Sequence, residues 1–444
     1  MRPAAHIATC MELLREFKGQ NAPFKRFHKE FFKTRRYAGS KDRRAVFNMA
    51  MQIFRHYYNL SRIISACGLP DDERSLILVY LYTCEGKDSA DLQALFMGGY
   101  TPEPLTADEL QALSLLAGFD GFDDALELPD FLLPSLLQNQ GEVILSSFAF
   151  MSRNILKPYF RSNPNKGERL DILEDMEGDG IAVKLAQDAD DDIPSLTPHL
   201  IELYGDENID LRNYPLYQNG LIEVQDKGAQ ILCNLVNITN KRSLWDYCAG
   251  AGGKSLYLAS QNPNLNVILS DVTAGKLKEA QMRFKRAGLP KPKVAILPKN
   301  LPALNHLKGQ IDVLILDVPC SGTGTWQRNP DLKLRLSPER LEEIMATQRQ
   351  IIDDALPYLK TGGTLYYMTC SLLAQENEQQ VAYILENHAS MKLIPITEHH
   401  SIAHELKEKA QAKGFTKEPT SPYLKIYPNV ENSDGFFMAV LEKK

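Results

Sequence analysis

Two cysteines follow apolar stretches that have the character of buried strands. Cys320 lies in Asp-Val-Pro-Cys-Ser-Gly after the run 313–316, and Cys370 lies in Thr-Cys-Ser after the run 364–368. Near-continuous apolar runs of this length are typical of parallel sheets that are covered on both faces. Ligands of such sheets bind outside the carboxyl ends of the strands, where both cysteines fall. The pair is therefore a candidate for covalent catalysis, whereas a single cysteine here would more simply be a small buried hydrophobe.

A glycine-rich stretch lies upstream of both cysteines. The sequence Asp-Tyr-Cys-Ala-Gly-Ala-Gly-Gly-Lys (246–254) is entered from apolar residues and leads into a helix-like segment, 255–260. Glycines at a strand-to-helix turn let the backbone approach a ligand, and free N–H groups at the helix start favour oxygen-rich partners. A second short strand, 267–271, ends in Asp271. This acid follows the loop at the spacing, about 20 residues, that suits hydrogen bonds to the ribose hydroxyls of an adenosine cofactor.

The spacing of these glycines argues against two common nucleotide sites. It departs from the dinucleotide pattern G-x-G-x-x-G, and the chain has no Gly-x-x-x-x-Gly-Lys-Ser/Thr run to grip a phosphate. The loop, the acid and the alternation of strands and helices together indicate a Rossmann-like site. An adenosine cofactor without a pyrophosphate, such as S-adenosylmethionine, fits this pattern best.

Four motifs in fixed order resemble one enzyme family. They are Cys-Ala-Gly-Ala-Gly-Gly-Lys (248–254), Asp271, Asp-Val-Pro-Cys-Ser-Gly-Thr-Gly-Thr-Trp-Gln-Arg-Asn-Pro-Asp (317–331) and Thr-Cys-Ser-Leu-Leu-Ala-Gln-Glu-Asn-Glu (369–378). This set resembles the RsmB/NOP2/Sun family of RNA cytosine-5 methyltransferases. The resemblance implies methyl transfer from S-adenosylmethionine to cytosine C5 in RNA and, for the bacterial RsmB-like members, in 16S ribosomal RNA.

The chemistry of that reaction accounts for the residue types. Cytosine C5 is a poor nucleophile, so a thiolate first adds to C6 and turns the ring into an enamine that attacks a sulfonium methyl group. The resemblance assigns this addition to Cys370 and assistance in resolving the adduct to Cys320. It places Asp317 beside the base, where a protonated carboxyl near N3 would neutralise the charge that develops.

The resemblance also defines an expected cofactor site, without a metal. Ala251 stands where the family commonly has proline, and Asn300 stands where members often place an acid near the adenine. We expect Asn300 to offer a hydrogen bond in place of that carboxylate. The expected cofactor-binding residues are Cys248, Ala249, Gly250, Ala251, Gly252, Gly253, Lys254, Asp271, Asn300 and Asp317.

The first part of the chain has the periodicity of helices. A capping box, Thr106-x-x-Glu109, marks the start of one of them. We expect residues 1–125 to form an all-α domain that resembles the NusB-like, RNA-binding domain of bacterial RsmB-type members. The helical segments expected are 8–17, 45–64, 75–83 and 110–117.

Three further segments complete the expected organisation. Residues 126–144 are predicted to be a linker. Residues 145–215 are predicted to form a small α+β RNA-recognition-like subdomain whose first strand lies at 153–157. Residues 216–444 are predicted to form the α/β Rossmann-like class I methyltransferase domain that binds S-adenosylmethionine.

Charge is distributed unevenly along the chain. A net charge of −6 by itself argues against RNA binding, because affinity for RNA rests largely on neutralising phosphates. Residues 25–44 nevertheless hold nine basic and two acidic residues, with aromatic side chains between them. Because Phe24, Phe27 and Phe31 are helically spaced, the segment is either a solvated helix face above a core stripe or an RNA-binding face. One helix can be both.

Composition excludes other classes of protein. The chain shows no secretory signal or apolar run long enough for a membrane span. Seven cysteines without a Cys-x-x-Cys pair favour reduced thiols over a disulfide framework or a zinc site. We expect a cytoplasmic monomer whose partner is RNA. The alternatives are a DNA cytosine-5 methyltransferase with Cys320 as nucleophile, an RNA-binding ribosome-assembly factor with little catalysis, and a redox pair of the two cysteines.

Overall fold

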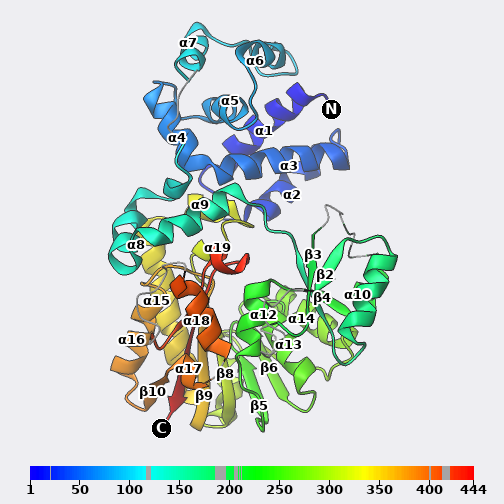
Figure 1. Cartoon of the computed structure of the whole chain (residues 1–444), viewed down its shortest axis with the longest axis vertical. Helices are drawn as coiled ribbons and strands as arrows, with labels where there is room; N and C mark the ends of the chain where they lie inside the picture. The colour runs from blue at the N-terminus through cyan, green and yellow to red at the C-terminus, as the bar shows by residue number, and fades with distance from the viewer. Residues whose placement is uncertain are drawn as a thin grey trace. The chain divides into compact units, whose positions relative to one another are not determined.

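The chain forms two compact units, each built from two separate stretches of sequence. The computed structural model describes residues 1–20, 22–116, 122–185, 197–204, 209, 211, 213–399, 402–412 and 421–444. The first unit is Met1–Ile155 with Trp326–Pro338, and the second is Leu156–Thr325 with Glu339–Lys444 (Figure 1). None of the helices in the described ranges combines the length and apolar character that a membrane span requires.

The first unit is helical, as predicted. The helices between residues 3 and 116 share one apolar core, in which the rings of Phe17, Phe24 and Phe54 pack against one another. The capping box is confirmed, because Glu109 N donates to Thr106 Oγ1 and Thr106 N donates to the Glu109 carboxylate. The likeness to a NusB-like domain stays a prediction. The helices are α1 (Pro3–Phe17), α2 (Phe24–Thr34), α3 (Ser40–Arg55), α4 (Tyr57–Ala66), α5 (Glu73–Thr83), α6 (Ser89–Leu95), α7 (Ala107–Leu116), α8 (Leu133–Gln140) and α9 (Leu145–Arg153).

Two parts of the first unit are organised differently from the sequence prediction. The single helix expected over 45–64 is two helices, because α3 ends at Arg55 and α4 begins at Tyr57. The linker expected over 126–144 contains α8 and short 3-10 turns. Its leucines Leu128, Leu132 and Leu136 are buried, so this segment is folded into the first unit and does not act as a linker.

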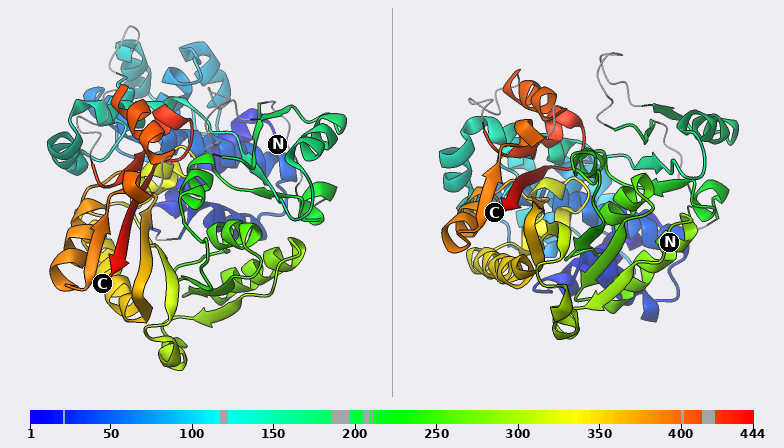
Figure 2. Two further views of the ribbon diagram at one scale, coloured as in Figure 1. Left: turned by 60° about the horizontal axis from the view of Figure 1, so that its bottom comes forward. Right: turned by 90° about the horizontal axis from the view of Figure 1, so that it is seen from below.

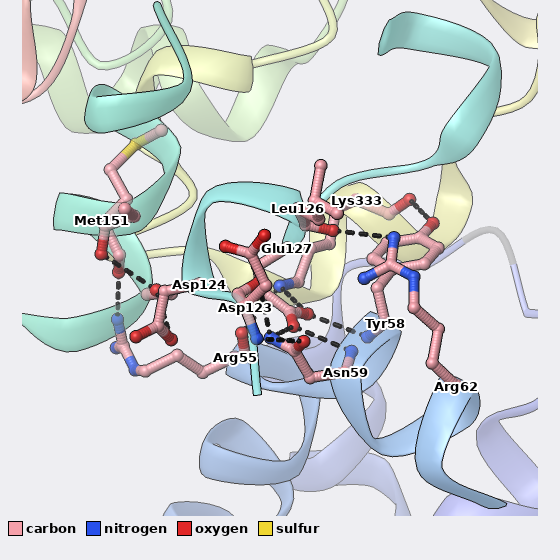
Figure 3. Close-up of polar contacts among 12 residues, drawn as sticks. Arg55, Tyr58, Asn59, Arg62, Asp123, Asp124, Leu126, Glu127, Met151 and Lys333 are labelled. Carbon is pink, nitrogen blue, oxygen red and sulfur yellow. Dashed lines mark hydrogen bonds and ion pairs between the residues drawn. The ribbon is translucent and has the colours of Figure 1, made fainter. Parts of the chain in front are cut away.

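The segment 326–338 joins the first unit although it is distant from it in sequence. Lys333, within η6 (Pro330–Arg335), donates from Nζ to Glu127 Oε1 and to the Arg55 carbonyl, both at 2.7 Å. Glu127 also accepts hydrogen bonds from Tyr58 N, Asn59 N and Asn59 Nδ2 (Figure 3). Lys333 and Glu127 side chains are 3% and 1% exposed, so this is a buried ion pair with its remaining lone pairs satisfied.

Removing the lysine from this pair is expected to destabilise the first unit. Lys333→Ala leaves the Glu127 carboxylate buried without its counter-charge, which costs about 3–5 kcal/mol of unfolding free energy. Urea unfolding followed by circular dichroism measures the loss. Lys29→Ala, which removes an exposed lysine from α2, is the matched control and should cost within about 0.5 kcal/mol. A Lys333→Ala variant as stable as this control would contradict the account of the pair.

A small antiparallel sheet opens the second unit. Its order is β2-β3-β1-β4, and α10 (Arg169–Gly178) follows the first strand. The prediction of a strand at 153–157 is wrong. The helix α9 extends to Arg153, and the first strand is Tyr159–Ser162, all four residues of which are buried. Residues 186–196, 205–208, 210 and 212 of the predicted subdomain lie outside the described residues. The strands are β1 (Tyr159–Ser162), β2 (Val183–Leu185), β3 (Leu200–Leu203) and β4 (Ile222–Val224).

The larger sheet of the second unit confirms the Rossmann-like prediction. The strands are ordered β10-β12-β9-β8-β5-β6-β7, with β11 paired to β12 (Figure 2). Strands β7, β6, β5, β8 and β9 pair in parallel, whereas β12 is antiparallel to β9. The strands are β5 (Ser243–Asp246), β6 (Asn266–Asp271), β7 (Lys293–Ile296), β8 (Ile311–Asp317), β9 (Leu359–Thr369), β10 (Met391–Ile394), β11 (Leu424–Ile426) and β12 (Phe436–Lys443).

Helices cover both faces of this sheet. Along β8, Val313 and Ile315 join one core with helices α12, α13 and α14, while Leu314 and Leu316 join a second core with α15 and α16. This alternation explains why the strand reads as a continuous apolar run. The remaining helices are α11 (Pro215–Gln218), α12 (Lys227–Asn234), α13 (Gly253–Gln261), α14 (Ala274–Arg286), α15 (Pro338–Ala355), α16 (Glu378–Asn387), α17 (Ile396–His399), α18 (Ile402–Ala412) and α19 (Pro428–Glu431).

Candidate active site

The predicted site residues follow the ends of neighbouring parallel strands. The strand β5 leads into the glycine loop, β6 ends at Asp271, β8 ends at Asp317, and β9 ends immediately before Cys370. Because these strands are parallel neighbours, their carboxyl ends meet at one edge of the sheet. The sequence expectation that the loop, the acids and the cysteines gather at this edge is therefore confirmed.

The two cysteines are in direct contact. Cys320 Sγ lies 3.3 Å from Cys370 Sγ, both side chains are half-buried, and neither is in a disulfide. The hydrogen bond with Cys370 and burial together raise the pKa of the Cys320 thiol well above its ordinary value. Cys320 therefore stays protonated at neutral pH and is a poor nucleophile there.

Asp317 is paired with a lysine of the glycine loop. Lys254 Nζ lies 2.5 Å from Asp317 Oδ2. Burial alone would lower the pKa of Lys254, but the charge and hydrogen bond of Asp317 outweigh it and raise the pKa. Lys254 is therefore protonated and forms a salt bridge with Asp317. The expected role of Asp317, a carboxyl that faces the base, stays a prediction, and the contact with Lys254 adds a cation to that position.

The glycine loop is held against Asp271. Gly250 N donates to Asp271 Oδ2 at 3.0 Å, and Thr273 N donates to Asp271 Oδ1 at 2.8 Å. Gly250 has φ +55°, and no other atom lies within 4 Å of the position where a Cβ would stand. Gly252 has φ +73° and packs against Ala280 of α14, so a side chain there would be strained and crowded. The loop thus presents open backbone beside a carboxylate.

The other predicted cofactor residues lie along the same loop and at the end of β7. Ala249 N donates to Ser270 O at 2.8 Å, and Ala251 O accepts from Arg283 Nη1 at 2.9 Å. These two hydrogen bonds fix the loop, which a proline at position 251 would otherwise stiffen. Cys248 is half-buried, and burial raises its pKa well above the ordinary value. Asn300 Oδ1 accepts from Ile296 N at 2.8 Å. That bond orients the Asn300 side chain at the carboxyl end of β7.

Sequence reasoning gave no role to two buried acids of this region. Asp246 ends β5 and accepts a hydrogen bond from Ser255 Oγ at 2.7 Å, and burial raises its pKa to about 7. Glu376 lies in the quoted 369–378 motif and hydrogen-bonds to the residue that follows each cysteine. A signal for both existed, since Asp246 begins the glycine-rich stretch 246–254 and Glu376 lies in the motif 369–378, but spacing alone does not show what an acid contacts.

Comparison with known proteins finds a family match over the part of the chain that holds these strand ends. Residues 233–442 match the family model "16S rRNA methyltransferase RsmB/F". These residues belong to the RsmB/F methyltransferase family. The cysteine pair, the Lys254–Asp317 pair and the Asp271 loop all fall inside the RsmB/F domain.

Curated relatives of the RsmB/F domain carry consistent names. The chain is 29% identical over 317 residues to a probable ribosomal RNA small subunit methyltransferase B of Synechocystis sp., covering 71% of this chain and 66% of that protein. It is 33% identical over 234 residues to ribosomal RNA small subunit methyltransferase B of Shewanella oneidensis, covering 53% and 50%. The aligned part of the chain thus spans about half to two thirds of the length of these relatives.

Solved structures support the fold. The crystal structure of PH0851 superposes with a TM-score of 0.72 at 20% identity, covering 100% of this chain and 99% of that one. NSun6 from Pyrococcus horikoshii with SFG superposes with a TM-score of 0.55 at 18% identity, covering 71% and 98%. At such identities the likeness is one of architecture. It supports the Rossmann-like fold of the second unit.

Proposed function

We propose that this protein methylates C5 of a cytosine in ribosomal RNA, most specifically the 16S RNA of the small subunit, through a covalent cysteine–C6 adduct. The observation that carries the proposal is the pair of thiols 3.3 Å apart beside the Lys254–Asp317 ion pair, at the carboxyl ends of β8 and β9. The family match and the names of the curated relatives support ribosomal RNA as the substrate.

Each residue has a distinct part in the proposed reaction. Cys370 Sγ adds to C6 of the cytosine. The ammonium of Lys254, held by Asp317, donates to the ring nitrogen where negative charge develops, so the pair does what was first expected of Asp317 alone. After methyl transfer, a water molecule accepts the C5 proton, the electron pair of the C5–H bond forms the C5–C6 double bond, and the C6–S bond breaks. The Cys320 thiol hydrogen-bonds to the departing Cys370 sulfur and assists its release.

The loop residues fit S-adenosylmethionine as the methyl donor. That cofactor would supply an electrophilic methyl group on a sulfonium. Each Asp271 oxygen accepts one backbone N–H and keeps a lone pair for a ribose hydroxyl, and the open backbone at Gly250 leaves room for the ligand. Asn300 and Lys254 would complete the site at its two ends. NSun6, a structural neighbour, was solved with SFG, an S-adenosylmethionine analogue, which supports this assignment.

Removing the Asp271 carboxylate is expected to weaken cofactor binding. Asp271→Ala should cost roughly 1.5–3 kcal/mol of binding free energy, the usual contribution of a hydrogen bond to a charged group. Calorimetric titration with S-adenosylmethionine measures this. Glu279→Ala removes an exposed acid from neighbouring α14 and should leave the affinity unchanged. A folded Asp271→Ala variant that binds as tightly as the parent would remove Asp271 from the site.

The basic segment of the first unit supports RNA as the partner. Phe24, Phe31 and Phe32 of α2 are buried, while Lys25, Arg26, Lys29 and Arg36 are exposed. The helix therefore has both a core stripe and a basic face. Two arginines of the segment serve the fold instead, because Arg35 pairs with Glu12 and Glu16 and Arg43 donates to Ala38 O.

Neutralising the exposed basic face is expected to weaken RNA binding. The triple variant Arg26→Ala, Lys29→Ala, Arg36→Ala should raise the RNA dissociation constant and reduce the slope of log K against log salt by about 0.7 for each phosphate that is no longer neutralised. Fluorescence anisotropy with labelled 16S RNA fragments measures both. A control that removes three exposed lysines from the second unit, at positions 308, 392 and 444, should leave the slope nearer the parent value. Equal salt slopes for the two variants would mean that the basic face of α2 is only solvated and does not bind RNA.

The proposed substrate is tested by transfer of a labelled methyl group. Purified protein, labelled S-adenosylmethionine and unmodified 16S RNA should give labelled RNA, while 23S RNA and cytosine-containing DNA remain unlabelled. Label in DNA but not RNA would favour the DNA cytosine-5 methyltransferase alternative. RNA binding without label in any nucleic acid would favour an assembly factor.

A further inference from the structure

A buried carboxylate joins the two loops that carry the cysteines. Glu376 is fully buried and lies between the end of β9 and the start of α16. Its Oε1 accepts from Ser321 N at 2.8 Å, and its Oε2 accepts from both Ser321 Oγ and Ser371 Oγ. Ser321 follows Cys320 and Ser371 follows Cys370 in the chain. One side chain thus holds the residue after each cysteine.

The Cys320 loop is fixed on both sides of the thiol. Gln348 of α15 donates from Nε2 to Glu376 Oε1 at 3.1 Å and to Pro319 O at 3.0 Å. Pro319 precedes Cys320, and Ser321, which follows it, is bound to Glu376 directly. The backbone around Cys320 is therefore anchored at both neighbours to the same buried carboxylate and its amide partner.

The Cys370 loop is fixed to the same network. Ser371 Oγ lies 2.5 Å from Glu376 Oε2 and 3.1 Å from Thr323 Oγ1. Leu372 N donates to Thr323 Oγ1 at 2.8 Å, and Gly324 N donates to Cys370 O at 2.9 Å. A Cβ at Gly324 would stand 2.4 Å from Gly435 O, so no larger residue allows this close approach. The two loops have little freedom to separate while Glu376 holds its partners.

We infer that Glu376 is a positioning residue that sets the separation of the Cys320 and Cys370 thiols. Its side-chain hydrogen bonds go to Ser321, Ser371 and Gln348, and it acts on the thiols through the two serines. The catalytic meaning of this role rests on the proposed function, whereas the geometric role does not. A purely structural acid would support the fold without fixing the distance between the thiols.

Two substitutions of Glu376 distinguish the effect of its position from the effect of its charge. Glutamine keeps the shape of glutamate: its Oε1 can accept from Ser321 N and Gln348, and its Nε2 can donate to the two serine hydroxyls, which rotate to accept. Alanine removes all four hydrogen bonds and leaves buried donors unpaired. If position matters and charge does not, Glu376→Gln retains the thiol geometry and Glu376→Ala loses it.

A dithiol probe tests the geometry without any substrate. Phenylarsine oxide condenses with two nearby thiols, forming two As–S bonds and releasing water. Titration followed by intact mass and competition with a free dithiol gives its affinity, and the variant Cys320→Ala, Cys370→Ala defines the contribution of the other cysteines. Glu376→Ala should bind about tenfold more weakly than the parent, because the effective concentration of the second thiol falls. Glu376→Gln should stay close to the parent.

Two outcomes would overturn the inference. One is parental arsenical affinity in a folded Glu376→Ala variant, and the other is equal loss in the alanine and glutamine variants. If Glu376→Ala does not fold, the double variant Ser321→Ala, Ser371→Ala replaces it, because it removes the two hydroxyl groups and keeps the carboxylate. The same loss of arsenical affinity is expected, and parental affinity there would also overturn the inference.

The kinetics of methyl transfer provide a second test, because a purely structural role of Glu376 would not lower kcat selectively. A shift of the thiols by about 1 Å costs roughly 10²-fold in kcat. Glu376→Ala should therefore lower kcat while KM for RNA stays close to the parent value, and Glu376→Gln should restore turnover. A change confined to KM would contradict the role. If the parent protein transfers no methyl group, the proposed function fails, and the arsenical result still decides the geometric role.

Discussion

Cys370→Ala is expected to abolish methyl transfer and every covalent species between this protein and RNA. Without this thiol no bond forms to C6, and C5 stays too weak a nucleophile to take the methyl group. Removal of a covalent nucleophile costs on the order of 10⁴-fold or more in kcat. Transfer of labelled methyl groups and denaturing gels of protein–RNA mixtures measure the two losses.

The control for this variant is an equal substitution away from the site. Cys67→Ala changes a cysteine of the first unit that lies outside the catalytic strand ends, and it should leave turnover and adduct formation intact. Affinity for S-adenosylmethionine should be the same in both variants. Methyl transfer by folded Cys370→Ala at the parental rate would exclude Cys370 as the nucleophile.

Cys320→Ala is expected to slow the last step of the reaction, the release of the Cys370 sulfur from C6. Cys370 remains able to add to C6, but the departing sulfur loses the thiol that lies 3.3 Å away. Loss of a general acid slows a step by about 10²–10⁴-fold. A denaturation-resistant RNA–protein complex should therefore accumulate when methyl donor is present, and it appears as a shifted band on a denaturing gel.

The double variant distinguishes the two assignments. Cys320→Ala combined with Cys370→Ala should lose the shifted band, because the trapped complex depends on the nucleophile. If Cys370→Ala traps RNA and Cys320→Ala does not, the roles are reversed. The mechanism would then be of the DNA type, with the nucleophile in the Pro-Cys motif.

The sequence predicts the edge of the sheet well because strand ends and motif residues coincide. Continuous apolar runs before Asp317 and Cys370 indicate buried parallel strands, and β8 and β9 end where those runs end. The capping box at Thr106 likewise sets a helix start through local hydrogen bonds. In each case the signal lies within a few residues of the feature, so one sequence suffices.

Contacts between distant residues are what the sequence does not reveal. The break between α3 and α4 at His56 lies within an uninterrupted apolar pattern. The pairing of Lys333 with Glu127 joins residues 206 positions apart, and no local pattern places 326–338 in the first unit. The contact between Asp317 and Lys254 was not predicted for the same reason, since the two residues lie 63 positions apart.

Identification of the methylated nucleoside tests the central claim most directly. Purified protein is incubated with unmodified 16S RNA and S-adenosylmethionine, the RNA is digested to nucleosides, and the products are separated and weighed by mass spectrometry. The account predicts 5-methylcytidine, absent when Cys370→Ala replaces the parent protein, with bisulfite sequencing locating it at a defined cytosine. A methyl group found on another base, on ribose or on another atom of cytosine would contradict it.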